Sequence, residues 1–249
     1  MIIKKALGWL PDGLDFRDYK FSEVMQVPLK LPMKADIREK LTPIRDQGNL
    51  GSCTGFGTAA ALEALDPPPK AIMSPLFIYY RARAILGTVN EDSGGVIRDC
   101  IKSCAEKGTC YEACWPYNIS KFKITPPGSC YWQAEKHQIL SYYRINTLRE
   151  MKVCLAAGFG FVFGFAVYGS MYSTRTIETG IIPMPKTYEN YEGGHCVFGC
   201  AYNDNTELIT IRNSWGSDIG DKGYFYLPYD YVSARNLSDD FWTVRKIEL

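Results

Sequence analysis

The sequence changes character near Gly158, and this change constrains the fold more than any other feature. Before it, N-cap and C-cap signals predict helices over residues 53–65, 74–86, 96–107 and 147–157. After it, segments rich in aromatic and β-branched residues predict strands over 159–168, 195–202, 207–213, 223–227 and 241–247. Helices followed by strands, without an internal repeat, predict an α+β fold in two packed halves with a cleft between them.

The helix over residues 53–65 has unusual composition at its start. Cys53 lies in its first turn after Ser52, and the segment is Ala-rich until Pro67–Pro69 end it. Gly55 and Gly57 each cost a helix about 1 kcal/mol relative to Ala. Their presence predicts that another part of the chain packs close to this first turn.

Residues 1–32 lack a sustained period and predict an extended leader, so the folded domain is expected to cover residues 33–249. Lys4 and Lys5 are followed by Pro11 and Asp12 without an apolar segment, so no secretory signal is expected. The sequence has no run of about 18 apolar residues, and no membrane span is expected. These features favour an intracellular location.

The charge balance limits the possible binding partners, and the cysteine content indicates the redox compartment. The chain has 28 Lys and Arg against 27 Asp and Glu. This balance excludes the strong positive electrostatic field that would attract nucleic acid or an anionic membrane. We expect a monomer without a cofactor. Nine cysteines cannot all pair within one chain, and with no secretory signal they favour a reducing compartment with mostly free thiols.

The two histidines differ in their surroundings. His137 lies in a polar stretch, where a solvated histidine is expected. His195 follows Gly193 and Gly194 at the entry to an apolar strand, and in isolation it is most simply a core histidine. Its interpretation depends on motifs elsewhere in the chain.

Three separated segments together resemble the papain family of cysteine proteases. They are Gln47-Gly-Asn-Leu-Gly-Ser-Cys53, Gly193-Gly-His195-Cys and Asn213-Ser-Trp215-Gly. His195 follows Cys53 by 142 positions and Asn213 follows it by 160, against the roughly 130 to 150 typical of the family. Asp36-Ile-Arg, Ser93-Gly-Gly and Trp115-Pro-Tyr117 are similar to further family motifs, and the likeness covers residues 33–249.

This resemblance implies a papain-like fold, with a helical half and a β-barrel-like half, and a cysteine peptidase, expected to be an endopeptidase, that acts on peptides or proteins. Cys53 is implied as nucleophile, His195 as acid and base, and Asn213 as the group that orients the imidazole. Gln47 and the Cys53 N–H are implied as the oxyanion hole. The resemblance implies that Trp215 covers the His195–Asn213 pair and that Gly94, Gly95 and Gly194 bind substrate. A helix N-terminus and an imidazolium both favour the Cys53 thiolate.

The sequence also departs from the family. Leu50 stands where many members have a disulfide cysteine, which fits a reducing compartment, and Thr54 replaces a Trp, which is expected to reshape the leaving-group side. The short leader resembles those of some prokaryotic and large-virus relatives, so a virion-associated location is an alternative. We expect the leader to lie across the cleft and restrain activity, as in a zymogen.

The spacing Cys100-x3-Cys104-x5-Cys110-x3-Cys114 is compatible with a zinc site. Because the segment also matches an ordinary family helix and turn, buried thiols are the favoured interpretation, and no metal ligand is predicted. Three other functions stay open for the chain as a whole. They are a catalytically silent peptide-binding protein, an acyl transferase on the same scaffold, and a metal- or redox-responsive module.

Overall fold

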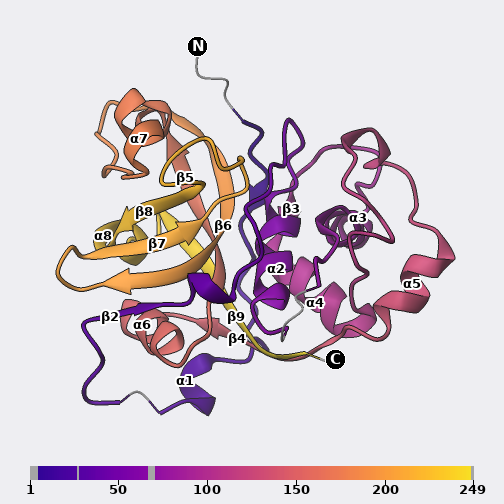
Figure 1. The fold of residues 1–249 in the computed structure, drawn as a ribbon, viewed down its shortest axis with the longest axis horizontal. Helices are drawn as coiled ribbons and strands as arrows, with labels where there is room; N and C mark the ends of the chain where they lie inside the picture. The colour runs from indigo at the N-terminus through magenta and orange to yellow at the C-terminus, as the bar shows by residue number, and fades with distance from the viewer. Residues whose placement is uncertain (1–4, 27, 67–70, 248–249) are drawn as a thin grey trace.

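A computed structural model describes residues 5–26, 28–66 and 71–247. Its helices and strands separate into the two predicted halves: α3, α4 and α5 lie on one side and a seven-stranded sheet lies on the other (Figure 1). Helix α2 (Cys53–Glu63) lies between them, in contact with both α3 and strand β6. The nucleophile candidate therefore begins the helix that joins the two halves.

The four predicted helices are confirmed, with small shifts at their ends. They are α2, α3 (Pro75–Leu86), α4 (Ile97–Lys107) and α6 (Leu148–Ala156). The caps explain the boundaries, since the Ser74 and Thr147 side chains each accept a hydrogen bond from a backbone N–H of the first turn. Residues 67–69, the predicted stop of α2, lie outside the described residues.

Shorter helices were not predicted, because segments of this length lack a readable period. They are α1 (Phe21–Val24), α5 (Gly128–Ala134), α7 (Thr174–Thr179), α8 (Tyr229–Ser233) and the 3-10 turns Arg38–Lys40, Ile119–Lys121 and Gly169–Tyr172.

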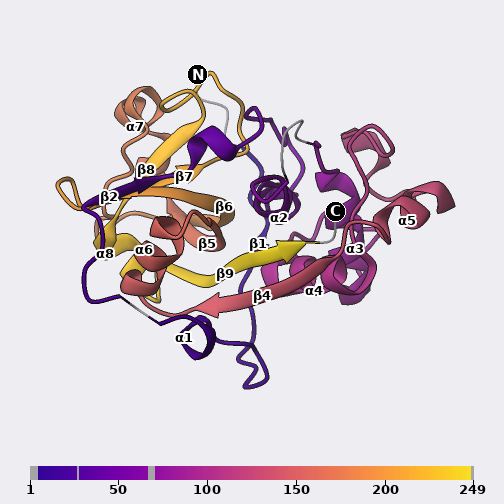
Figure 2. The ribbon, with the colours of Figure 1, turned by 60° about the horizontal axis from the view of Figure 1, so that its bottom comes forward.

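The large sheet has the order β4-β9-β5-β6-β7-β8, with β2 paired to β6. Its strands are β2 (Lys34–Asp36), β4 (Ile139–Ile145), β5 (Phe161–Tyr168), β6 (Tyr191–Asn203), β7 (Leu208–Arg212), β8 (Tyr224–Pro228) and β9 (Ser238–Ile247). The five predicted strands are confirmed, whereas β2 and β4 were not predicted. The half described as barrel-like is a sheet that does not close (Figure 2).

The first turn of α2 packs as closely as its glycines predicted. A Cβ on Gly55 would lie 2.4 Å from the Pro75 carbonyl oxygen, and one on Gly57 would lie 2.9 Å from the Cys196 sulfur. Every residue of α2 is buried. Glycines at the first turn therefore let α3 and β6 approach the backbone that carries Cys53.

The leader crosses between the two halves. Strand β1 (Trp9–Leu10) pairs in parallel with β3 (Gly95–Val96), and the indigo chain in Figure 1 runs down between the sheet and the helices. Within the described residues, the helices are all too short or too polar to cross a membrane.

Candidate active site

Cys53 is fully buried at the start of α2. Burial raises the pKa of its thiol to about 11. Nearby backbone groups, among them those of Cys196, on β6, and of Gly8, in the leader, lower the pKa by less. With the leader in place the thiol is therefore neutral at physiological pH.

His195 lies on β6 and is oriented by Asn213, at the end of β7. The His195 Nε2 and Asn213 Oδ1 atoms are 2.7 Å apart, and the Ser214 N–H donates to the same oxygen at 2.7 Å. Because an amide oxygen only accepts hydrogen bonds, Nε2 carries the proton in the neutral ring. The other nitrogen, Nδ1, has no hydrogen-bond partner among the described residues and is left as the basic atom.

Burial also controls the charge of His195. It lowers the pKa of the imidazole to about 4, against an opposite effect of the hydrogen bond to Asn213. The predicted thiolate–imidazolium pair is thus disfavoured while the leader covers the site, since both partners are buried. That pair remains a prediction for the uncovered site.

Trp215 packs against the imidazole. Its ring centroid lies 4.6 Å from that of His195, and its ring stacks on that of Tyr172 with the centroids 6.0 Å apart. Trp215 is 3% exposed. The indole is therefore buried against the ring that bonds Asn213, and its shielding of that hydrogen bond from water stays a prediction.

Gln47 is fully buried, and its side-chain amide takes part in three hydrogen bonds. Its Oε1 accepts a hydrogen bond from Ser214 Oγ at 2.6 Å, which leaves Nε2 as the donor. Nε2 donates to the Leu50 carbonyl at 2.8 Å and to the Ala6 carbonyl at 3.1 Å. The predicted oxyanion donor therefore already binds a peptide carbonyl, supplied by the leader.

The three predicted substrate glycines also contact the leader. Gly95 N–H donates to the Gly8 carbonyl at 2.8 Å, and the Gly8 N–H donates to the Gly194 carbonyl at 3.0 Å. Gly94 has a φ of +78°, and a Cβ there would lie 2.5 Å from the Gly8 carbonyl oxygen. The predicted edge for peptide addition is thus occupied by the chain's own backbone.

The Trp9 side chain of the leader packs against β5 and β6. A Cβ on Gly164 would lie 2.0 Å from its ring, and one on Gly194 would lie 2.8 Å from it. The Trp9 Nε1 atom donates to Asp240 Oδ2 at 3.0 Å. Glycine at position 164 is therefore required for this indole to lie against β5.

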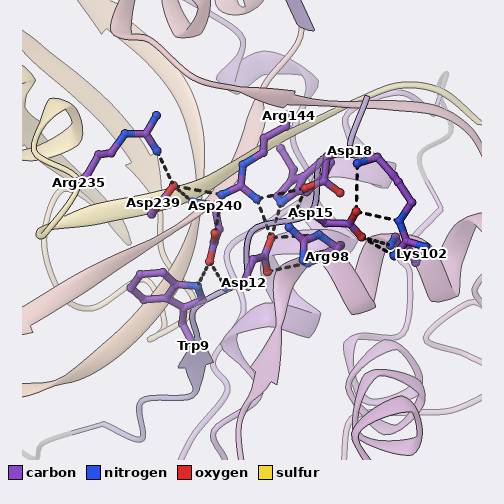
Figure 3. A network of polar contacts seen from close by, with 12 residues as sticks. Trp9, Asp12, Asp15, Asp18, Arg98, Lys102, Arg144, Arg235, Asp239 and Asp240 are labelled. Carbon is purple, nitrogen blue, oxygen red and sulfur yellow. Dashed lines mark hydrogen bonds and ion pairs between the residues drawn. The ribbon is translucent and has the colours of Figure 1, made fainter. Parts of the chain in front are cut away.

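A buried network of charges anchors the next residues of the leader (Figure 3). The Asp12 carboxylate is fully buried and accepts hydrogen bonds from Trp242 Nε1 at 2.9 Å and from Arg144 at 3.2 Å. The Asp12 N–H donates to Asp240 Oδ2 at 2.7 Å. Arg144 and Asp240 are themselves 2.9 Å apart, so leader and domain share one set of ion pairs.

Other predictions fared differently. Thr54 is buried, and its side chain lies against Gly95 and Cys100, the latter on α4. Its effect on the leaving-group side stays a prediction. His137, expected to be solvated, is partly exposed, and its ring centroid lies 4.4 Å from that of Tyr111. All nine cysteines are free thiols in this structure.

Several supporting residues were missed from the sequence. Ser214 holds Gln47, and the Tyr117 hydroxyl bonds the Gln47 carbonyl at 2.7 Å and Ser52 Oγ at 2.6 Å. Asp92 accepts from the Gly51 N–H at 3.0 Å. Among these residues, the sequence pointed only to Tyr117, through the Trp115-Pro-Tyr117 motif, and that motif indicated no role for the Tyr117 hydroxyl.

Comparisons with known proteins agree with this geometry. Residues 31–239 match the model of papain family cysteine proteases. A peptidase C1-like protein of Acanthamoeba polyphaga mimivirus is 39% identical over 81% of this chain and 69% of its own length. Cysteine proteinase 1 of Entamoeba histolytica is 29% identical over 81% of this chain and 65% of its own. The match therefore spans about two thirds of these relatives.

Solved structures give the same picture for the whole chain. Xylellain, a cysteine protease from Xylella fastidiosa, superposes with a TM-score of 0.87 at 38% identity, covering 97% of each chain. A procathepsin B from Trypanosoma congolense superposes with a TM-score of 0.75 at 15% identity, covering 96% of this chain and 85% of its own, which shows the fold alone.

Proposed function

The chain belongs to the papain family of cysteine proteases, and we propose that it hydrolyses peptide bonds through an acyl-thioester on Cys53. The observation that carries the proposal is the hydrogen bond from His195 Nε2 to Asn213, which leaves Nδ1 as a base on the strand that contacts Cys53. Endopeptidase activity is part of the proposal.

The proposed reaction starts from a neutral thiol and a neutral imidazole in the uncovered site. The Cys53 proton moves to His195 Nδ1, and the sulfur attacks the scissile carbonyl carbon. Gln47 Nε2 and the Cys53 N–H stabilise the oxygen anion that forms. The imidazolium then gives its proton to the leaving amine, and later takes one from the water that hydrolyses the thioester.

The chemical identity of the reaction product distinguishes hydrolysis from acyl transfer. A short peptide amide incubated with the chain and an excess of a simple amine is expected to give the free carboxylic acid. Mass spectrometry identifies the product. An amide of the added amine as the main product would favour the acyl transferase, and no turnover by any uncovered form would favour the silent binding protein.

Replacing Gln47 by glutamate tests the oxyanion hole. Gln47→Glu keeps the side-chain shape but replaces the Nε2 donor with an acceptor, so we expect kcat to fall by about 10²–10³. KM should change little, because the contact strengthens in the transition state. Steady-state kinetics on a peptide amide measures both, and an unchanged kcat would remove Gln47 from the mechanism.

We also propose that the leader is inhibitory. Its backbone occupies three positions at once: the Gln47 donor, the Cys53 sulfur and the Gly95 edge. A substrate carbonyl cannot reach Gln47 while Ala6 is bound there. Release of residues 5–12 from the cleft is therefore required for activity.

Trp9→Ala should activate the full-length chain. Burying a tryptophan contributes about 3–5 kcal/mol in a core, and Trp9 is partly buried, so we expect leader docking to weaken by roughly 2–3 kcal/mol. The turnover rate of a small peptide should rise by roughly 30- to 150-fold, up to the limit set by a fully open site.

Phe16→Ala is the matched control, because Phe16 belongs to the same leader but is 95% exposed. It should leave the rate unchanged. If Trp9→Ala, and also deletion of residues 1–30, leave the turnover of a small peptide substrate unchanged, the leader is not inhibitory.

The proposal extends to the partners and the location of the protein. Balanced charge gives no basis for a nucleic-acid or anionic-membrane partner, and the nine free cysteines suit a reducing compartment. We propose an intracellular or virion-associated monomer that acts on peptides or proteins. Light scattering of the purified chain tests the monomer.

A further inference from the structure

Three cysteines that the proposed mechanism does not use come together on the helical half. The sulfurs of Cys110, Cys114 and Cys130 all lie within 4.8 Å of one another. Cys110 and Cys130 are fully buried, whereas Cys114 is partly exposed. The grouping differs from the four cysteines that the spacing suggested, since Cys100 and Cys104 lie on α4, outside this cluster.

Two independent segments carry the three sulfurs. Cys110 and Cys114 flank one turn, in which the Cys114 N–H donates to the Tyr111 carbonyl at 3.0 Å. Cys130 lies on α5, and the Tyr111 N–H donates to Gln133 on the same helix at 2.8 Å. The turn and α5 are thus held in register without the sulfurs, which makes the cluster preorganised.

The separation of two of the sulfurs lies between that of a covalent bridge and that of a metal site. The sulfurs of Cys114 and Cys130 are 3.0 Å apart, about 1 Å longer than a disulfide. Thiolates at 2.3 Å from a tetrahedral ion are separated by about 3.8 Å, so a small outward movement of these two would seat one. A disulfide between them would also leave the sulfur of Cys110 without a role.

We propose that Cys110, Cys114 and Cys130 bind a thiophilic metal ion, Zn²⁺ or Cu⁺, as a structural site remote from Cys53. Cys110-x3-Cys114 has a spacing used by zinc-binding pairs, and soft thiolates select these ions. Binding replaces three S–H bonds by three sulfur–metal bonds and releases three protons to solvent. Three thiolates suffice for trigonal Cu⁺, while Zn²⁺ would add a water on the exposed side of Cys114.

The electrostatics of the empty cluster are consistent with this assignment. Burial, followed by the charges of Cys130 and Cys114, raises the pKa of the Cys110 thiol well above its usual range. Burial likewise raises the pKa of Cys130 to about 11. Neighbouring thiolates repel one another in this site, and a bound cation removes that penalty.

The site would support the active-site wall through a short segment. Trp115 and Tyr117 lie one and three residues after Cys114, and the Trp115 carbonyl accepts a hydrogen bond from Ser74 Oγ at 2.7 Å. Tyr117 in turn bonds the Gln47 carbonyl and Ser52. A metal at Cys114 would therefore fix the chain that braces Gln47, and its first effect would be on stability.

The experiment is elemental analysis of the full-length chain purified under reducing conditions and equilibrated with Zn²⁺ or with Cu⁺. The Cys53→Ala background is used throughout, so that the proposed nucleophile cannot bind metal. We expect one metal ion per chain, lost in Cys114→Ser and in Cys130→Ser and retained in Cys104→Ser, the matched control from α4. The element found distinguishes zinc from copper.

A second measurement guards against misfolded variants. Replacement of the metal by Co²⁺ should give a thiolate-to-cobalt charge-transfer band, which disappears in Cys114→Ser. Removal of the metal by a chelator should lower the Tm of the parent by roughly 5 °C or more and leave Cys114→Ser unchanged. A parent chain that binds no metal, retention of metal by Cys114→Ser, or a mass 2 Da low from a Cys114–Cys130 disulfide would each overturn the proposal.

Discussion

Replacing His195 by alanine is expected to lower kcat on a peptide amide by roughly 10⁴–10⁶-fold, the range seen when one member of a nucleophile–base pair is removed. The loss is this large because the same nitrogen must take the Cys53 proton and later protonate the leaving amine. The effect should appear both in the full-length chain and in the Trp9→Ala background, so that the covering leader does not mask it.

The chain supplies its own control for this experiment, since it has only two histidines. His137 lies beside Tyr111 on the helical half, and His137→Ala should keep kcat within about threefold. A His195→Ala chain that retains a tenth of the parent rate, with the peptide cut at the same bond, would contradict the proposed mechanism.

The second large effect concerns Glu63, a buried charge at the far end of α2. Its Oε1 accepts from Arg45 at 2.6 Å and from the Met73 N–H at 3.0 Å. Its Oε2 accepts from Thr42 and lies 3.8 Å from Arg212, the residue before Asn213. Glu63 therefore ties the helix that carries Cys53 to β7, the strand that ends directly before Asn213.

Glu63→Ala is expected to lower the free energy of unfolding by about 3–5 kcal/mol, because the buried Arg212 loses its carboxylate partner and Arg45 keeps only the more distant Glu112. Urea denaturation followed by fluorescence measures the change through the midpoint at constant m. Glu39→Ala, at an exposed glutamate, is the control and should stay within about 0.5 kcal/mol. A loss below about 1 kcal/mol for Glu63→Ala would show that the ion pairs offset their own desolvation.

The helices could be predicted where capping signals in the sequence mark their ends. Ser74 before Pro75, and Gly108 after Lys107, are local signals, and the structure begins and ends α3 and α4 near them. The start of β6 was placed four residues late, at His195, because Gly193 and Gly194 indicate a turn. In the structure, pairing with β5 keeps these glycines in the strand.

The contacts that were missed join residues far apart in the chain. Trp9 lies on Gly164 and bonds Asp240, and no periodicity links those positions. Cys130 joins Cys110 and Cys114 only because α5 packs beside their turn. Family motifs indicated the candidate site residues, but not that burial raises the pKa of Cys53 and lowers that of His195, nor that Gly8 of the leader lies near the Cys53 sulfur.

The central claim is that His195 activates the thiol of Cys53. The most direct test is the rate at which an epoxide alkylates the thiols of the Trp9→Ala chain, with the adduct mapped by mass spectrometry. We predict fast labelling at Cys53 alone, and a loss of that labelling when His195→Ala is added. Labelling of Cys53 at the same rate without His195, or preferential labelling of another cysteine, would contradict the account.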